Sequence, residues 1–314
     1  YYMLDGFQIV AALFLVMALG YVLAAKGWID AEVAAFLSKT IVYLGVPASA
    51  VSNLLTHVDR AMLAEAPLAL GVVFLAVAAF LGLSFLLARV LRIREGRRGI
   101  FAVMVSCANT IFIGLPVCQA LFGDAAASYV LLYDLSNSVL FWTLGVYLVG
   151  RDSGAAHPFF SVRTMKKLLS PGFLGLCAGI VLVLLGAQLP LFLEKTCKYF
   201  GGLCTPLALL YVGYSLHRIG LKNLRIGREV LCVVLGRAVL IPLCMLGIVR
   251  LAGLPADMSR VFVAVAAMPA MNNAPIVAGE YGSDVEFSSQ CLSVTMIVSL
   301  LLLPVWKLAL GALW

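Results

Sequence analysis

The stretch that decides the fold is Cys-Ala-Asn-Thr-Ile-Phe-Ile-Gly-Leu-Pro, residues 107–116. It lies near the middle of a segment that is otherwise apolar enough to cross a bilayer. Gly114 and Pro116 weaken or break a helix, and the freed backbone groups have no water to bond with in hydrocarbon. Such breaks persist only where they are buried in protein or line a polar cavity. The polar pair Asn109-Thr110 in the same stretch therefore predicts a site.

A second stretch, residues 268–275, has the same character and reads Met-Pro-Ala-Met-Asn-Asn-Ala-Pro. Pro269 and Pro275 disrupt a helix there. The adjacent amides of Asn272 and Asn273 can donate N–H groups to a carboxylate or give oxygen to a cation. We predict that the two broken segments form one substrate site.

The composition is that of an all-α polytopic membrane protein. Of 314 residues, 63% are hydrophobic and 12% are charged, whereas roughly a quarter of the residues in soluble domains are charged. The net charge of +7 gathers in particular loops, as membrane topology requires, so lipid and not nucleic acid is the expected surrounding. The eight cysteines form no Cys-x-x-Cys pair and the three histidines fall in loops. We therefore expect no metal site, and no cofactor beyond a coupling H⁺ or Na⁺.

Ten membrane spans can be drawn along the chain. Lys and Arg concentrate in the connections that follow spans 3, 5 and 7. The positive-inside rule places these connections in the cytoplasm and both termini outside the cell (inner) membrane. In order, spans 1 to 10 are residues 7–26, 32–55, 66–91, 98–122, 127–149, 171–188, 191–216, 227–251, 258–281 and 288–312.

The second half of the chain matches the first at a separation of 159 residues. Proline matches carry the most weight, because proline is disfavoured inside helices. Each half holds five spans, and an odd number makes the halves inverted repeats related by a pseudo-two-fold axis in the membrane plane. The predicted parts are a first repeat (1–150), a cytoplasmic linker (151–170) and a second repeat (171–314). The matched pairs are Gly20/Gly179, Gly27/Gly186, Lys39/Lys198, Pro47/Pro206, Pro116/Pro275 and Phe122-Gly123/Tyr281-Gly282.

The two motifs, Ala108-Asn109-Thr110 with Gly114-Leu115-Pro116 and residues 268–284, resemble those of the auxin efflux carrier family. That family includes plant auxin exporters and bacterial permeases for small organic acids such as malate and malonate. The resemblance covers essentially the whole chain. Only about 20 residues join the halves, where the plant carriers have a long loop. This argues for the bacterial organic-acid permease type and against auxin as the substrate.

The resemblance implies a sodium/proton-antiporter-like or bile-acid-symporter-like fold. Spans 1, 2, 6 and 7 would form a scaffold, and spans 3–5 and 8–10 a transport domain in which the broken spans 4 and 9 cross. The family's carboxylate-binding asparagines map onto Asn109 and onto Asn272 or Asn273. Thr110 is the remaining polar candidate at the first break.

Three further features leave alternatives open. Arg237, inside span 8, binds a substrate carboxylate, pairs with Asp134 or extends its charged end toward the cytoplasm. Asp134 and Asn137 share one face of span 5, where Asp134 carries a coupling proton or braces the broken helix and Asn137 reaches the substrate. Pro47 and Pro206 break or kink spans 2 and 7, either as a scaffold feature or beside the substrate path.

These features predict secondary active transport of a small organic anion, a mono- or dicarboxylate, by an elevator-like alternating-access mechanism. The alternative within the same fold is a Na⁺- or H⁺-coupled symporter or exchanger. An enzyme is not expected, because the sequence holds no HExxH motif, nucleophile elbow or phosphate loop. Scaffold faces of this architecture often pair, so a homodimer is the expected assembly.

Overall fold

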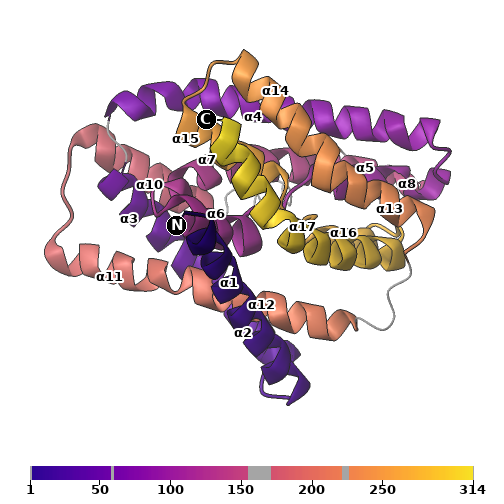
Figure 1. The fold of residues 1–314 in the computed structure, drawn as a ribbon, viewed down its shortest axis with the longest axis horizontal. Helices are drawn as coiled ribbons and strands as arrows, with labels where there is room; N and C mark the ends of the chain where they lie inside the picture. The colour runs from indigo at the N-terminus through magenta and orange to yellow at the C-terminus, as the bar shows by residue number, and fades with distance from the viewer. Residues whose placement is uncertain (1, 58–59, 155–170, 221–225, 314) are drawn as a thin grey trace.

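The computed structural model describes residues 2–57, 60–154, 171–220 and 226–313. The predicted linker, residues 151–170, lies outside this part of the chain from residue 155 onward. All regular elements within the described ranges are helices, apart from one isolated β-bridge. Figure 1 shows α4 and α14 along one side of the molecule in this view, and α11 and α12 along the opposite side.

The first half begins with the long helix α1 and ends with α8. Its elements are α1 (Tyr2–Ala25), α2 (Ala31–Thr40), η1 (Ile41–Gly45), α3 (Val46–His57), α4 (Arg60–Val90), η2 (Glu95–Arg97), α5 (Arg98–Ser106), η3 (Thr110–Gly114), α6 (Leu115–Phe122), α7 (Ala126–Leu140), η4 (Phe141–Gly145) and α8 (Val146–Asp152).

The second half runs from α10 to α17. Its elements are α10 (Pro171–Leu185), α11 (Leu191–Gly202), α12 (Cys204–Ile219), α13 (Arg228–Leu235), η6 (Gly236–Leu240), α14 (Ile241–Leu251), α15 (Ala256–Ala266), α16 (Ala274–Glu280) and α17 (Val285–Leu313).

The described helices suit a polytopic membrane protein. Four continuous helical runs have the length and apolar composition needed to cross a bilayer, and the bent α17 can be counted as a fifth. Their outer faces carry many exposed large hydrophobic side chains, which a bilayer would cover. The four runs are Ala31–Thr56, Ala66–Val90, Leu191–Arg218 and Arg228–Leu251.

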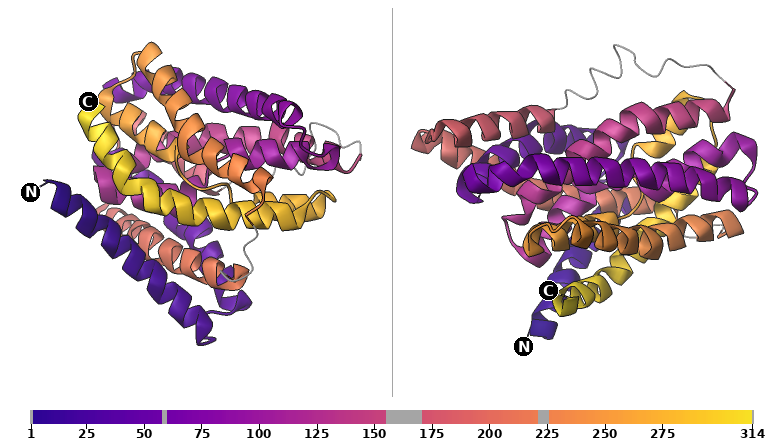
Figure 2. Two further views of the ribbon diagram at one scale, coloured as in Figure 1. Left: turned by 45° about the vertical axis from the view of Figure 1, so that its right-hand side comes forward. Right: turned by 90° about the horizontal axis from the view of Figure 1, so that it is seen from above.

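Helices from the two halves of the chain pack in two matching pairs. Helix α1 lies along α12, and α10 lies along α3 with α11 beside it (Figure 2). On the other side, α4 packs against α5 and α7, and α15 packs against α14 and α7. Both α5 and α15 are buried along almost their whole lengths. The two helices that lead into the predicted breaks therefore form the centre of the molecule.

Prolines coincide with wide π-helical turns. The turns η1, η3 and η6 are each followed, two residues after their end, by Pro47, Pro116 and Pro242 respectively. Proline has no N–H, and its ring collides with the carbonyl group of residue i−4 in a regular helix. A π turn shifts the bonding to residue i−5 and relieves that collision. Pro47 thus follows a π-bulge and does not break the helix. Pro206 lies in the first turn of α12, after a single turn residue, Leu203, within the run Leu191–Arg218.

The interruption lies at the upstream end of the predicted stretch, residues 107–116, and not at Gly114 and Pro116. Gly114 has helical backbone angles (φ −58°, ψ −48°), and Pro116 stands in the first turn of α6, where proline is tolerated. The non-helical residues are instead Cys107, Ala108 and Asn109. The second break spans residues 267–273, with Pro269 inside it and Pro275 in the first turn of α16.

Repeat-matched glycines share the same local geometry. Gly27 and Gly186 have φ of 75° and 63°, and Gly123 and Gly282 have φ of 88° and 72°. This left-handed region is accessible mainly to glycine. All four follow the end of a helix, so the separation of 159 residues relates equivalent chain turns.

Gly20 is required for close helix packing. A Cβ atom added there would lie 2.4 Å from the carbonyl oxygen of Leu210 in α12. At its repeat partner Gly179, an added Cβ atom would lie 2.6 Å from the side-chain Cδ1 of Leu54 in α3. These two glycines let α1 approach α12, and α10 approach α3, closely.

Gly20→Ala is expected to lower the melting temperature of the purified protein in detergent. The added methyl group collides with backbone, and overpacking of this kind costs about 1–3 kcal/mol. Gly71→Ala is the control, because its new methyl group would meet nothing within 4 Å in the same kind of helix. Equal melting temperatures for the two variants would contradict the packing role.

Candidate functional site

The two breaks bond directly to each other. Ala108 and Ala270 form an antiparallel β-bridge. The N–H of Asn109 donates to the carbonyl of Pro269 (2.9 Å), and the N–H of Met271 donates to the carbonyl of Cys107 (3.1 Å). Pro269 has no N–H that would need a partner, and its carbonyl accepts one of the two hydrogen bonds of the bridge. Backbone groups released where α5 and α15 stop are thus satisfied by the opposite break.

Side chains from α7 and α17 complete the bridge. Asn137 in α7 donates its Nδ2 to the carbonyl of Ala108 and accepts the N–H of Ala108 on its Oδ1, both at 3.1 Å. On the other edge, Thr295 in α17 accepts the N–H of Ala270 on its hydroxyl oxygen (3.3 Å). Asn137 is fully buried and does not line the cavity. The structure thus assigns it the bracing of the break and does not bring it to the predicted substrate position.

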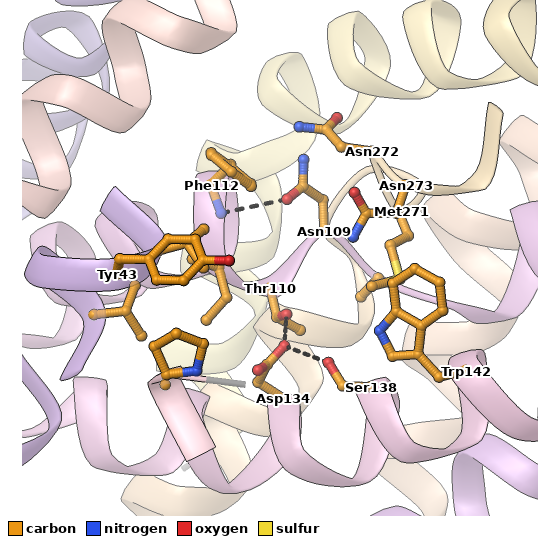
Figure 3. A pocket seen from close by; sticks show the side chains of 16 residues that line it. Tyr43, Asn109, Thr110, Phe112, Asp134, Ser138, Trp142, Met271, Asn272 and Asn273 are labelled. Carbon is orange, nitrogen blue, oxygen red and sulfur yellow. Dashed lines mark hydrogen bonds between the residues drawn. The ribbon is translucent and has the colours of Figure 1, made fainter. Parts of the chain in front are cut away.

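A cavity of about 420 Å³ opens beside the bridge (Figure 3). It brings together Asn109, Thr110, Asp134, Asn272 and Asn273 from separate parts of the chain. Its full lining is Val42, Tyr43, Val46, Ala108, Asn109, Thr110, Ile111, Phe112, Asp134, Ser138, Trp142, Pro171, Gly172, Met271, Asn272 and Asn273.

Two asparagines in the cavity hold polar atoms without a protein partner. Asn109 caps η3, accepting the N–H of Phe112 on its Oδ1 (3.3 Å). Its Nδ2 is buried and finds no partner among the described residues, and the same holds for both amide atoms of Asn272. Figure 3 shows these two amides at the same end of the cavity. Buried polar groups are rarely left unpaired, so these atoms mark a place for a ligand.

Asp134 is the centre of a cluster of oxygens on the opposite wall. Its Oδ1 accepts the hydroxyl groups of Thr110 and of Ser138, the latter at 3.3 Å. Asp134 is half-buried and is the only charged residue in the lining given above. The Thr110 hydroxyl is therefore engaged by the protein in this state.

Arg237 lies outside the cavity and is completely buried. Its Nε donates to the carbonyl of Met268 and its Nη1 to the carbonyl of Val105, both at 2.9 Å. Within the described ranges it makes no ion pair, so it neither pairs with Asp134 nor extends to an exposed position. The structure likewise does not place Arg237 where it could contact a substrate in this cavity.

Aromatic walls of the cavity were missed by the sequence reasoning. Tyr43 comes from η1 and Trp142 from η4, and Phe112 stacks at 4.9 Å and 30° on Tyr211 of α12. Tyr43 precedes Pro47 by four residues, so the kink at Pro47 was a usable signal for that wall. Thr295 gave no signal, because a threonine inside an apolar span is common packing.

A charged cluster ties together one end of the same group of helices. We call Arg94, Arg97, Glu229 and Asp284 the Arg97 cluster. Arg97 pairs with both Glu229 and Asp284, and Arg94 lies 3.6 Å from Asp284. Burial acts to raise the pKa of Asp284, but the N–H of Phe287 and the Arg97 guanidinium outweigh it and hold that pKa below its ordinary value.

Asp152 caps α5 from a different helix. It accepts the N–H groups of Gly99 and Ile100, both at 2.8 Å, and the hydroxyl of Ser283 at 3.0 Å. Burial raises the pKa of Asp152 in spite of these donors. The caps and the Arg97 cluster thus connect the starts of α5, α13 and α17 with the end of α8, and none of these residues lines the cavity.

Comparison with known sequences agrees with this arrangement. A family model described as a membrane transport protein matches residues 5–307. The chain belongs to this family, the auxin efflux carriers. The resemblance seen in the two motifs is therefore confirmed, and the chain is a membrane transporter by family.

Two relatives cover nearly the whole length of this family member. An uncharacterized transporter from Methanothermobacter thermautotrophicus is 26% identical over 307 residues, covering 96% of this chain and 98% of the relative. Another uncharacterized transporter, from Methanocaldococcus jannaschii, is 23% identical over 304 residues, covering 95% and 97%. Both are named as transporters without a substrate.

Asn137→Ala is expected to destabilise the folded transporter by about 2 kcal/mol or more, because it leaves two buried backbone groups of Ala108 without partners. The measurement is the melting temperature in detergent without added ligand. Ser138→Ala, one residue further along, is the control, since it removes only the hydroxyl bond to Asp134. A native-like melting temperature for Asn137→Ala would contradict the bracing role.

Proposed function

We propose that this family member carries out secondary active transport of a small organic anion across the cell (inner) membrane. The observation that carries the proposal is the group of unpartnered amide atoms on Asn109 and Asn272, beside the first turn of η3. A carboxylate accepts N–H bonds from such amides and is also favoured at the positive end of a helix. Asn273 lines the same cavity as a further amide.

The same cavity favours a monocarboxylate within the predicted class. No Lys, Arg or His belongs to the lining as described, so the second carboxylate of a dicarboxylate would find no cationic partner. The walls of Tyr43, Phe112 and Trp142 suit an apolar body attached to one carboxylate. Thr110 would assist by holding Asp134 away from the anion.

Alternating access follows from an inverted pair of five-span repeats. Span 1 packs on span 7, and its repeat counterpart, span 6, packs on span 2, which supports the inverted relation. The glycines with positive φ that follow matching helices in the two halves support it as well. In the proposed mechanism spans 1, 2, 6 and 7 stay fixed. Spans 3–5 and 8–10 move past them as one body, with the crossing breaks of spans 4 and 9 carrying the substrate. The Arg97 cluster and Asp152 support rigid movement, because both connect elements of the moving part.

The topology and the assembly are proposals as well. The basic connections place both termini outside the cytoplasm. A homodimer would form through the lipid-facing scaffold helices.

A coupling ion is the second element of the proposal. An ionised Asp134 would repel an anionic substrate in the same cavity, so the substrate would enter together with a proton on Asp134. Na⁺ coupling is the alternative. It is supported by the oxygen atoms of Asp134, Thr110 and Ser138, which are hard ligands of the kind that alkali cations use.

Asn109→Ala and Asn272→Ala are each expected to weaken carboxylate binding about tenfold to a hundredfold, the effect of losing one hydrogen bond to a charged group. The measurement is the thermal shift of purified protein against acetate, benzoate, succinate and malate, followed by uptake of the carboxylate with the largest shift into proteoliposomes. Asn53→Ala is the control, since Asn53 bonds to Ser49 within α3 and does not line the cavity. Full binding and uptake by both cavity variants would defeat the assignment.

Asp134→Asn is expected to remove the pH dependence of transport. In the native protein uptake should fall as pH rises, because the proton on Asp134 is lost, whereas the amide needs no proton. Uptake is measured between pH 5 and pH 8 with and without Na⁺, with the surface variant Asp257→Asn as the control. Native uptake that requires Na⁺ and is unaffected by pH would select Na⁺ coupling instead.

A further inference from the structure

Arg237 occupies a position that the proposed binding groups do not explain. It is the largest fully buried side chain of the described residues and stands in the π turn η6, in the middle of span 8. Its titratable surroundings are Tyr133 and Cys107, which are both neutral at pH 7 in their ordinary state. No carboxylate neutralises its charge within the described ranges. A buried unpaired cation is costly, so a negative potential must favour it.

That potential comes from two helix ends. Val105 is the penultimate residue of α5, and Met268 follows the end of α15 by two residues. Each stopped helix presents carbonyl groups without intrahelical partners and carries roughly half a negative charge at its end. The guanidinium donates to the carbonyl of Val105 in the last turn of α5 and to the carbonyl of Met268 in the break just beyond the end of α15. One positive charge thus offsets about one negative charge at the crossing.

On the cavity side, the positive N-terminal end of a helical run faces the cavity. The continuous helical run η3–α6 begins at Thr110, with its N-terminal N–H groups and the free Nδ2 of Asn109 beside the cavity. Without Arg237, the carbonyl ends of α5 and α15 would cancel this positive pole and would attract a cation. With Arg237, the positive pole remains.

We infer that Arg237 is a positioning residue that sets the sign of charge accepted at the crossing, by neutralising the C-terminal ends of α5 and α15 from behind. This inference rests on the proposed transport of an organic anion and deepens it. Arg237 does not touch the substrate. It leaves the amides and the η3 N-terminus free to select a carboxylate over an uncharged molecule of the same shape.

The test compares matched pairs of probes on Arg237→Met, Arg237→Lys and the native protein. The pairs are acetate with acetamide, benzoate with benzamide and succinate with succinamide, and Na⁺ is tested as the chloride salt against choline chloride. Binding is measured by thermal shift in detergent. Arg260→Met is the control, because it removes the same charge from α15 at an ion pair with Asp257, away from the crossing.

Arg237→Met is expected to weaken carboxylate binding about tenfold or more, to leave amide binding within about threefold of native and to gain stabilisation by Na⁺. Arg237→Lys keeps the charge and should retain the preference for carboxylates, which loss of packing alone would not predict. Folded Arg237→Met with native carboxylate affinity would overturn the inference. If Arg237→Met does not fold, a folded Arg237→Lys that prefers amides or is stabilised by Na⁺ more than the native protein overturns it, and one that prefers carboxylates supports it.

The outcome also separates this inference from the proposed function. If the native protein binds no carboxylate but Arg237→Met gains Na⁺ binding, the charge-setting role stands and the organic-anion proposal fails. If the native protein binds carboxylates and Arg237→Met binds them equally well, the function stands and the role of Arg237 fails. If the native protein binds no carboxylate and Arg237→Met gains no Na⁺ binding, the inference and the proposed function are both overturned.

Discussion

A helix that stops inside an apolar interior leaves N–H and carbonyl groups that must find partners, and here each stopped helix finds them in the other. The bridge between Ala108 and Ala270 is short, yet much of the structure depends on it. Asn137 and Thr295 complete its two edges, and Arg237 bonds to the carbonyl ends behind it. The broken spans are therefore held together by backbone chemistry, which frees the neighbouring side chains to serve a ligand.

The arrangement separates bracing from binding. Polar groups on the protein side of the bridge are used by the backbone, as Asn137 illustrates. Polar groups on the cavity side, on Asn109 and Asn272, retain atoms without partners. Asparagine thus has two roles at this one bridge, and the difference lies in which side of the bridge the side chain faces. At the far end of the helices, the Arg97 cluster and the Asp152 cap keep these elements together without entering the cavity.

Much of this could be predicted from the sequence, because membrane constraints are strict. The all-helical membrane class and the family followed from hydropathy and two polar-proline motifs, and these motifs also named Asn109, Thr110, Asn272 and Asn273, which the structure brings into one cavity with Asp134. Within residues 107–116 the break lies before Asn109 and not at Gly114 or Pro116, because a π turn absorbs the disturbance that the proline signals. Asn137 and Arg237 share another reason: a sequence indicates that a polar side chain is buried but not which unpaired backbone group it bonds to.

The cap made by Asn109 has a consequence for affinity. Because its Oδ1 is held by the N–H of Phe112, the side chain cannot rotate freely, and its Nδ2 points in one direction before any ligand arrives. A ligand that accepts from this nitrogen then loses little rotational entropy of the protein on binding. The residue that ends the broken segment thereby also preorganises the recognition group, so that helix capping and ligand selectivity are linked through a single amide plane.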